Sequence, residues 1–340
     1  MSKTLSNIVI GTTLFLIVGS VGWYLYSNYS ALFFAEPVVD VPDASTVLQL
    51  PGSLILTLMP SIPLNSPAGI YAVSPKTGAT KKIEDTNSYF APSFSTNNFM
   101  AVTTATGSSS LQLMIVNVND REHPIFFTPP APLLFPGSSS WSPDNKFVVY
   151  EAVTALPTVG DVDIAHSRIV LLDATTGKQT ILDVGASPVF SQDGSIVYLK
   201  SDGIYHVPST VFAAGTSTQD KARVVWFDGY QATRDSHIAI SHDGKTLLAT
   251  HPHINSMIGY HINTTGEFTL TQTAGINTYA LFPVFSPNDT DVAFIELNKD
   301  AEGIITKNLS IVNVVTLQKH ILMDLVPYTN NFLSLSAWVK

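Results

Sequence analysis

The stretch Pro188-Val189-Phe190-Ser191-Gln192-Asp193-Gly194 decides the fold, because the chain repeats it. In such a stretch an apolar strand enters a turn, the Asp side chain caps the turn, and Gly accepts a left-handed backbone, so the chain reverses. A second clear copy is Pro283-Val284-Phe285-Ser286-Pro287-Asn288. The other copies are Pro92-Ser93-Phe94-Ser95, Ser140-Trp141-Ser142-Pro143-Asp144, Ile240-Ser241-His242-Asp243-Gly244 and a degenerate sixth, Ser336-Ala337-Trp338.

The spacing of these copies predicts a ring of equal units. Their apolar anchors fall at positions 94, 141, 190, 240, 285 and 338, which are 47, 49, 50, 45 and 53 residues apart. A period near fifty residues is typical of β-propellers, and each turn is followed by further apolar, β-branched strands. Four antiparallel strands per unit make one propeller blade. We therefore expect an all-β, six-bladed β-propeller of four-stranded antiparallel blades over residues 51–340.

The two ends of this domain complement each other. Before the first anchor there are three expected strands, at 54–58, 69–73 and 79–83, and no opening strand. After the last complete unit there is one opening strand, at 333–339, and nothing to follow it. The C-terminal strand is therefore expected to join the N-terminal blade, which closes the ring and removes its exposed edges.

The repeated motif resembles that of a known family, the TolB-like propellers built from WD40-like (PD40) repeats with the pattern Pro-x-Trp/Phe-Ser-Pro-Asp-Gly. The resemblance covers about residues 51–340. It implies the fold, but such blades also occur in peptidase propellers and in many envelope proteins, so it leaves the function open.

Composition excludes several classes of protein. With 340 residues, 45% of them hydrophobic, the chain can bury a large core and is not disordered. Only 13% of residues are charged and the formal net charge is -9, which argues against nucleic acid as a partner, because phosphate binding needs clustered Lys and Arg. The absence of Cys excludes disulfides, thiolate zinc sites and cysteine nucleophiles.

An apolar segment lies near the N-terminus. Residues 8–26 carry no charge and end in aromatic residues, which predicts one transmembrane helix in the lipid bilayer. Residues 1–7 would then be a short cytoplasmic end, residues 27–50 a linker, and the propeller would lie outside the cytoplasm in the periplasm or at the cell surface. The alternative is a cleaved signal peptide.

The search for chemistry finds no catalytic motif. The chain has no Gly-x-Ser-x-Gly elbow, no phosphate loop and no His-Glu-x-x-His, so we predict no catalytic residue, no metal and no cofactor. Five histidines lie between His237 and His261, but their spacing favours solvent-exposed loop histidines over a metal site. Asp161 and Asp163 could form a carboxylate pair, although acids in a loop are usually solvated.

The candidate contact residues gather on one side of the predicted disc, here called the loop face. It carries the connections between second and third strands and those between blades, including the expected connections at 119–137, 152–167, 228–236, 251–256 and 296–307. The predicted binding residues are Phe126, Phe127, Phe135, Asp161, Asp163, Arg234, Asp235, His237, His251 and His253.

Two hypotheses on function follow, and a third stays open. The first is a non-catalytic module that binds another envelope protein or a surface polymer through the loop face. The second is a propeller hydrolase or lyase with a polar or metal site at the channel mouth, to which Asp235 and His237 would contribute. The third is carbohydrate binding through exposed aromatic residues such as Trp226 and Tyr230.

Overall fold

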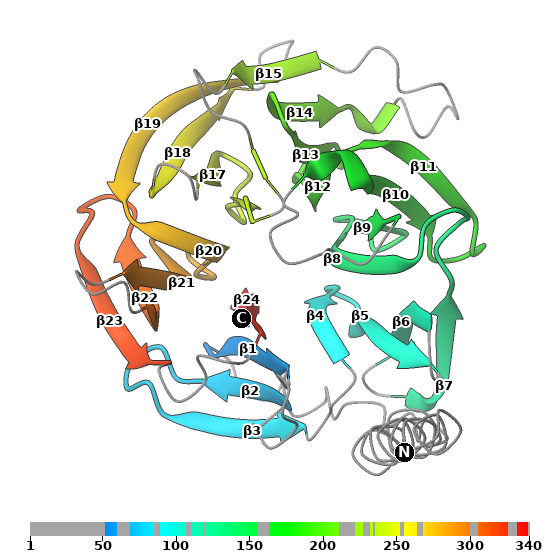
Figure 1. Ribbon diagram of the computed structural model, residues 1–340, viewed down its shortest axis with the longest axis horizontal. Helices are drawn as coiled ribbons and strands as arrows, with labels where there is room; N and C mark the ends of the chain where they lie inside the picture. Colours follow the sequence, from blue (N-terminus) through cyan, green and yellow to red (C-terminus); the bar gives the residue numbers. More distant parts are fainter. Residues whose placement is uncertain are drawn as a thin grey trace, which may run out of the picture. The chain divides into compact units, whose positions relative to one another are not determined.

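The protein is described by a computed structural model in which six four-stranded antiparallel sheets surround a central axis (Figure 1). The expected all-β, six-bladed propeller is therefore confirmed. The structure describes residues 52–59, 69–84, 89–106, 110–117, 120–154, 163–210, 222–226, 232–233, 235–251, 255–263, 268–299, 305–325 and 332–338.

The strands follow the chain order blade by blade, each blade running from its inner to its outer strand. Blade 1 comprises β24 (Phe332–Trp338), β1 (Leu54–Met59), β2 (Gly69–Val73) and β3 (Thr80–Glu84). Blade 2 comprises β4 (Tyr89–Phe94), β5 (Phe99–Thr106), β6 (Ser110–Asn117) and β7 (Asp120–Phe127). Blade 3 comprises β8 (Phe135–Trp141), β9 (Phe147–Val153), β10 (Ser167–Asp173) and β11 (Gln179–Val184), with the short 3-10 helix η1 (Ile164–His166) before β10.

The second half repeats this plan. Blade 4 comprises β12 (Ala186–Phe190), β13 (Ile196–Lys200), β14 (Gly203–Val207) and β15 (Ala222–Trp226). Blade 5 comprises β16 (Ile238–Ile240), β17 (Thr246–His251), β18 (Ser256–Asn263) and β19 (Thr269–Asn277). Blade 6 comprises β20 (Tyr279–Phe285), β21 (Asp291–Lys299), β22 (Ile305–Asn313) and β23 (Lys319–Asp324).

The repeated motif forms its turn through one hydroxyl group. In blade 3 the Ser142 hydroxyl donates to the Asp144 carboxylate at 2.7 Å and accepts the backbone N–H of Phe147 at 2.9 Å. Ser241 of blade 5 makes the same two bonds, to Asp243 and from Thr246. Each turn between the first two strands is thus closed by side chains as well as by the backbone, which explains why Ser and Asp recur at this spacing.

The C-terminal strand closes the ring as the sequence predicts. β24 pairs antiparallel with β1, with Leu54 opposite Trp338 and Leu58 opposite Leu333. The first and last strands of the domain therefore belong to the same blade, and β1 has a partner on both sides.

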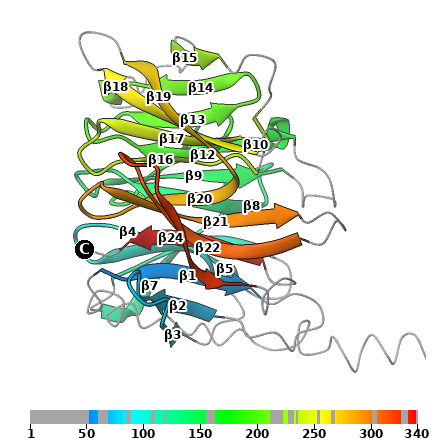
Figure 2. The ribbon, with the colours of Figure 1, turned by 90° about the vertical axis from the view of Figure 1, so that its left-hand side faces the viewer.

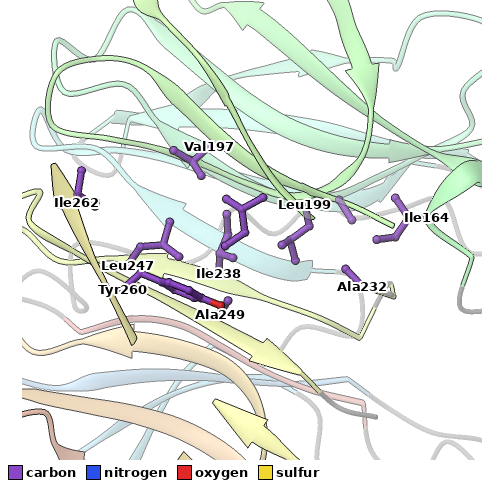
Figure 3. Packing of buried hydrophobic residues seen from close by; sticks show 11 residues of the cluster. Ile164, Val197, Leu199, Ala232, Ile238, Leu247, Ala249, Tyr260 and Ile262 are labelled. Atoms are coloured by element: carbon purple, nitrogen blue, oxygen red, sulfur yellow. The ribbon is translucent and has the colours of Figure 1, made fainter. Parts of the chain in front are cut away.

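The core consists of apolar layers between neighbouring blades. The layer between blades 4 and 5 joins Val197 and Leu199 of β13 to Leu247 and Ala249 of β17 (Figure 3). Ile164 of η1 also enters this layer, so η1 packs against the blade 4–5 junction. Burying each large aliphatic side chain is worth roughly 1.5–3 kcal/mol, which holds the blades together without covalent links.

Two expected connections are strands in the structure. Residues 119–137 contain β7 and the start of β8, so this segment supplies the outer edge of blade 2 and could not be deleted without loss of structure. Residues 296–307 contain the end of β21 and the start of β22, and Figure 2 shows these two long strands side by side. Polar residues such as Asn298 and Lys307 made this hairpin hard to recognise from the sequence, because polar strand positions carry no apolar signal.

Alternating strand direction separates the two sides of the propeller. The turns between first and second strands lie on what we call the turn face, and the loop face lies opposite. Within the described ranges no helix is long and apolar enough to cross a membrane; the expected anchor at residues 8–26 and linker at 27–50 lie outside those ranges.

Candidate functional site

The loop face contains a cleft of about 510 Å³ between blades 5 and 6. It lies where β19 passes into β20, next to the β21–β22 hairpin. This volume is in the range of sites that bind small ligands or protein side chains. The lining residues are Asn255, Asn277, Thr278, Tyr279, Glu296, Leu297, Asn298, Ile305 and Lys319.

The wall of the cleft contains a buried carboxylate. Glu296 is only 2% exposed, yet it accepts hydrogen bonds from the Thr278 hydroxyl at 2.5 Å and the Ser310 hydroxyl at 2.9 Å. The Lys319 ammonium group forms an ion pair with the same carboxylate. A buried charge needs such partners, because removing it from water without them costs several kcal/mol.

These partners also set the ionisation of Glu296. Burial alone would raise the pKa of the carboxyl group, but the bonds from Lys319, Thr278 and Ser310 outweigh it and hold the pKa below its ordinary value. The carboxylate is therefore ionised and its charge is balanced by Lys319. A group in this state positions its neighbours and is poorly suited to accept a proton from a substrate.

The other side chains that line the cleft carry amide, aromatic or aliphatic groups. Asn255, Asn277 and Asn298 are exposed and offer both hydrogen-bond donors and acceptors. Ile305 is 52% exposed and supplies apolar surface beside them. Burial, followed by the nearby charge of Asp235, raises the pKa of the Tyr279 phenol, so it is neutral at physiological pH. The cleft thus offers neutral hydrogen-bonding groups around an apolar wall.

Two of the predicted residues lie near this cleft. Asp235 is exposed before β16, close enough to act electrostatically on Tyr279. The His237 ring packs on Phe282 of β20 with 4.1 Å between ring centroids, and its backbone N–H donates to the Thr250 hydroxyl at 2.7 Å. Burial lowers the pKa of His237 to about 4, so the imidazole is neutral. Arg234, expected beside them, lies outside the described residues.

The expectation of solvent-exposed loop histidines is wrong for His251. It ends strand β17, is 6% exposed, and burial lowers its pKa to about 4. The sequence could not show this, because a strand that ends in Thr-His reads like the start of a loop. His253 lies outside the described residues. Among the residues that the structure describes, no group of three or more His, Cys, Asp or Glu side chains is placed to hold a metal ion.

The other predicted residues lie on blades 2 and 3. Phe127, at the end of β7, packs into the apolar layer between these blades, which also contains Trp141 and Tyr150. Phe126 and Phe135 are half-buried on β7 and β8. Asp163 caps η1, since its carboxylate accepts the Ala165 N–H at 2.8 Å. Asp161 lies outside the described residues, so the suggested carboxylate pair stays a prediction.

Sequence reasoning missed two buried carboxylates. Besides Glu296, Glu151 of β9 is 9% exposed and binds the Ser167 hydroxyl at 2.7 Å and the Ser187 N–H at 3.2 Å. A signal was present, because each acid follows a run of apolar residues within its strand, Val148 to Tyr150 before Glu151 and Val292 to Ile295 before Glu296. Acids in such positions are rarely buried without partners, and the partners come from other strands.

The inner strands carry no acidic or basic side chain. β4, β8, β12, β16, β20 and β24 together contain no Asp, Glu, Lys, Arg or His. Some of their hydroxyl groups join neighbouring blades: the Ser93 and Ser139 hydroxyls lie 2.7 Å apart, and the Ser187 hydroxyl accepts the Ile238 N–H at 3.1 Å.

No family model matches the sequence, and no curated protein is similar enough to match it. Solved structures do match. TolB from Acinetobacter baumannii is 15% identical with a TM-score of 0.52, covering 84% of this chain and 66% of that one. An oligogalacturonate lyase in complex with manganese is 12% identical with a TM-score of 0.50, covering 75% of this chain and 70% of that one.

The periplasmic gluconolactonase of Pseudomonas aeruginosa is also similar, at 13% identity and a TM-score of 0.50, covering 80% of this chain and 82% of that one. At these identities the likeness shows the fold alone. It confirms the TolB-like six-bladed propeller that the repeat motif indicated, and it places named enzymes and TolB among proteins of the same fold.

Proposed function

We propose that this protein is a membrane-anchored, non-catalytic interaction module that binds a protein of the cell envelope through its loop face. The cleft between blades 5 and 6 is the observation that carries the proposal. It combines exposed amides, a neutral phenol and an exposed isoleucine, which is the mixture of hydrogen-bonding and apolar surface found where proteins bind each other.

The state of the ionisable groups supports binding over catalysis. Glu296 is held ionised and paired with Lys319, while His237 and His251 are neutral and buried or packed on an aromatic ring. A general base needs a pKa near the working pH and access to a substrate proton. The groups around the cleft instead favour a rigid, neutral surface.

The proposed membrane anchor is the apolar segment near the N-terminus. Residues 8–26 would span the bilayer as a single helix, with residues 1–7 in the cytoplasm and the propeller in the periplasm or at the cell surface. This topology would keep the propeller close to membrane and envelope partners. Protease protection of the propeller in sealed membrane vesicles of known orientation tests it.

A matched pair of variants tests the binding proposal. Ile305 lines the cleft and is 52% exposed, while Ile321 lies on β23 outside it and is 57% exposed. In the full-length protein, crosslinked and purified from its native membrane, Ile305→Asp should lose the captured partner because a charge in the cleft opposes desolvation. Ile321→Asp should keep it, and both variants should melt like the wild type.

Two results would overturn the proposal. If Ile321→Asp loses the partner and Ile305→Asp retains it, the partner binds elsewhere. If no protein is captured, but the purified protein turns over a substrate and loses that turnover on substitution of Asp235 or His237, the channel-mouth enzyme is the correct alternative.

A further inference from the structure

A second pocket opens on the turn face, on the opposite side from the cleft. It has a volume of about 410 Å³ and lies between the first turns of blades 3 and 4. Two aromatic rings form its apolar walls: Phe147 of β9 is half-buried, and Phe190 of β12 is 9% exposed. The other lining residues are Ser142, Pro143, Asp144, Gln192, Asp193, Gly194, Ser209 and Thr210.

At the two blade junctions beyond blade 4, the corresponding turns are in contact. The Asp289 carboxylate accepts the backbone N–H groups of His242 at 2.8 Å and Asp243 at 2.9 Å, which joins blades 5 and 6. Between blades 4 and 5, Gly244 has a φ of +70° and lies so close to Gln192 that a Cβ atom would approach its side chain to 2.9 Å.

The junction between blades 2 and 3 is closed as well. The Asn145 side chain accepts the Thr96 N–H at 3.0 Å and donates to the Thr96 hydroxyl at 2.8 Å. The turns of neighbouring blades therefore contact each other at the blade 2–3, 4–5 and 5–6 junctions. The pocket lies at the blade 3–4 junction, between these bridged junctions.

The rim of the pocket is acidic. Asp193 is exposed and has no ion pair with Lys or Arg among the residues that the structure describes; its carboxylate holds the turn through Ser195. The Asp144 side chain is 51% exposed and pairs with Lys146 at 3.4 Å. Hydrogen bonding from Ser142 is the main cause that lowers the pKa of Asp144, so this carboxylate is ionised.

We propose that this pocket is a docking site for a protein segment that inserts an aromatic or aliphatic side chain between Phe147 and Phe190 and places an adjacent Lys or Arg against Asp193. Aromatic walls favour an apolar anchor, and the exposed carboxylate of Asp193 at the rim favours a cation beside it. The net charge of -9 adds a general attraction for such a segment. The site is independent of the loop-face cleft, so each can fail without the other.

The test uses a peptide of the stated chemistry as the probe. Binding of acetyl-Gly-Lys-Phe-Gly-amide to the full-length protein in detergent is measured by NMR titration, next to peptides with Glu in place of Lys or Gly in place of Phe. We expect the Lys-Phe peptide to bind about fivefold more tightly than either control, which is the range of one exposed ion pair or a small apolar contact.

Three protein variants locate the site. Asp193→Asn keeps the turn oxygen but removes the charge, and it should abolish the preference for Lys over Glu. Asp243→Asn changes the equivalent turn residue of blade 5, where the junction is closed, and should leave the preference unchanged. Ser209→Trp should fill the pocket and remove binding of all three peptides, with an unchanged melting temperature as the check on folding.

The other outcomes contradict the proposal. Equal effects of Asp193→Asn and Asp243→Asn would mean that the charge attracts cations from a distance, without a docking site. Binding that survives Ser209→Trp would place the peptide elsewhere. Binding of benzylamine without binding of the Lys-Phe peptide would make the pocket a site for a small amine, and binding of neither would leave no site at all.

Discussion

The indole N–H of Trp338 donates a hydrogen bond to the carbonyl oxygen of Gly52 at 3.2 Å. This bond joins the end of β24 to the residues before β1. Together with the pairing of Leu54 and Trp338, it brings the two ends of the propeller into one sheet. The ring is therefore closed by hydrogen bonds and packing between segments that are almost the whole domain apart in sequence.

Deleting residues 332–340 should destroy the cooperative unfolding of the whole propeller, because it removes the inner strand of blade 1 and exposes the edge of β1. The buried side chains of Leu333 and Leu335 would be lost with it. Differential scanning calorimetry of the truncated protein measures this. Trp338→Phe, which keeps the strand and loses one hydrogen bond, should cost only about 1 kcal/mol. A truncated protein with the wild-type transition would disprove the closure.

Glu296→Gln should lower the free energy of unfolding at pH 7 by about 1–3 kcal/mol, because the buried group loses its ion pair with Lys319 and one strong acceptor. The pKa of Glu296 is lower in the folded protein than in the unfolded chain. The stabilisation that its carboxylate provides is therefore fully present above the unfolded pKa, and it is lost as pH falls through the folded pKa. Urea unfolding at pH 7 and pH 3 should show that the difference between variant and wild type shrinks in acid. The exposed Glu122→Gln is the control, and an equal loss there would refute the role of burial.

Three histidines should make the fold sensitive to mild acid. Burial lowers the pKa of His206, and lowers the pKa of His237 and His251 to about 4. The unfolded chain binds protons at these groups near pH 6.5 while the folded chain does not, so stability falls as pH drops from about 6.5 to 4.

The slope for one fully buried histidine approaches about 1.4 kcal/mol per pH unit. His251→Leu, which removes one such group, should therefore flatten the dependence of unfolding free energy on pH in this window. Urea titrations at several pH values give the slopes. His166→Leu, at an exposed position in η1, is the comparison, and equal slopes for both variants would show that burial of His251 is not the cause.

Two inner-strand residues that precede a proline should differ in how substitution by glycine changes the stability of the protein. Ala91 and Ser187 both have positive φ, 45° and 51°, where a side chain is strained. Ala91→Gly should be neutral or stabilise by up to about 1 kcal/mol, since relief of strain exceeds the entropy cost. Ser187→Gly should destabilise, because the buried N–H of Ile238 loses its acceptor. Thermal melts of both variants measure these changes in stability. Stabilisation of both variants would mean that the hydrogen bond from the Ile238 N–H to Ser187 contributes little to stability.

The repeat motif was sufficient to predict the blades. Ser, Asp and Gly at fixed spacing act within five residues of one another, so a local pattern reports a local turn, as at Ser142 and Asp144. The ring closure was also predictable, because an unpaired opening strand at one end and three strands at the other leave one arrangement without open edges.

The candidate cleft was not predictable. Glu296 and Lys319 lie on different strands, and their pairing depends on how β21 and β23 are twisted in one blade. His251 illustrates the same limit, since its burial depends on the packing at its blade junction and not on the residues beside it in the chain. The start of β22 is equally hard to predict, because its polar residues carry no apolar signal of a strand.

The sequence by itself determined the all-β class, the number of blades and the strand that closes them, because these depend on short-range turns and on the period at which they recur. Only the tertiary structure decided where the cleft and the turn-face pocket lie. Both arise between blades, and side chains from different blades meet there only after neighbouring sheets have packed.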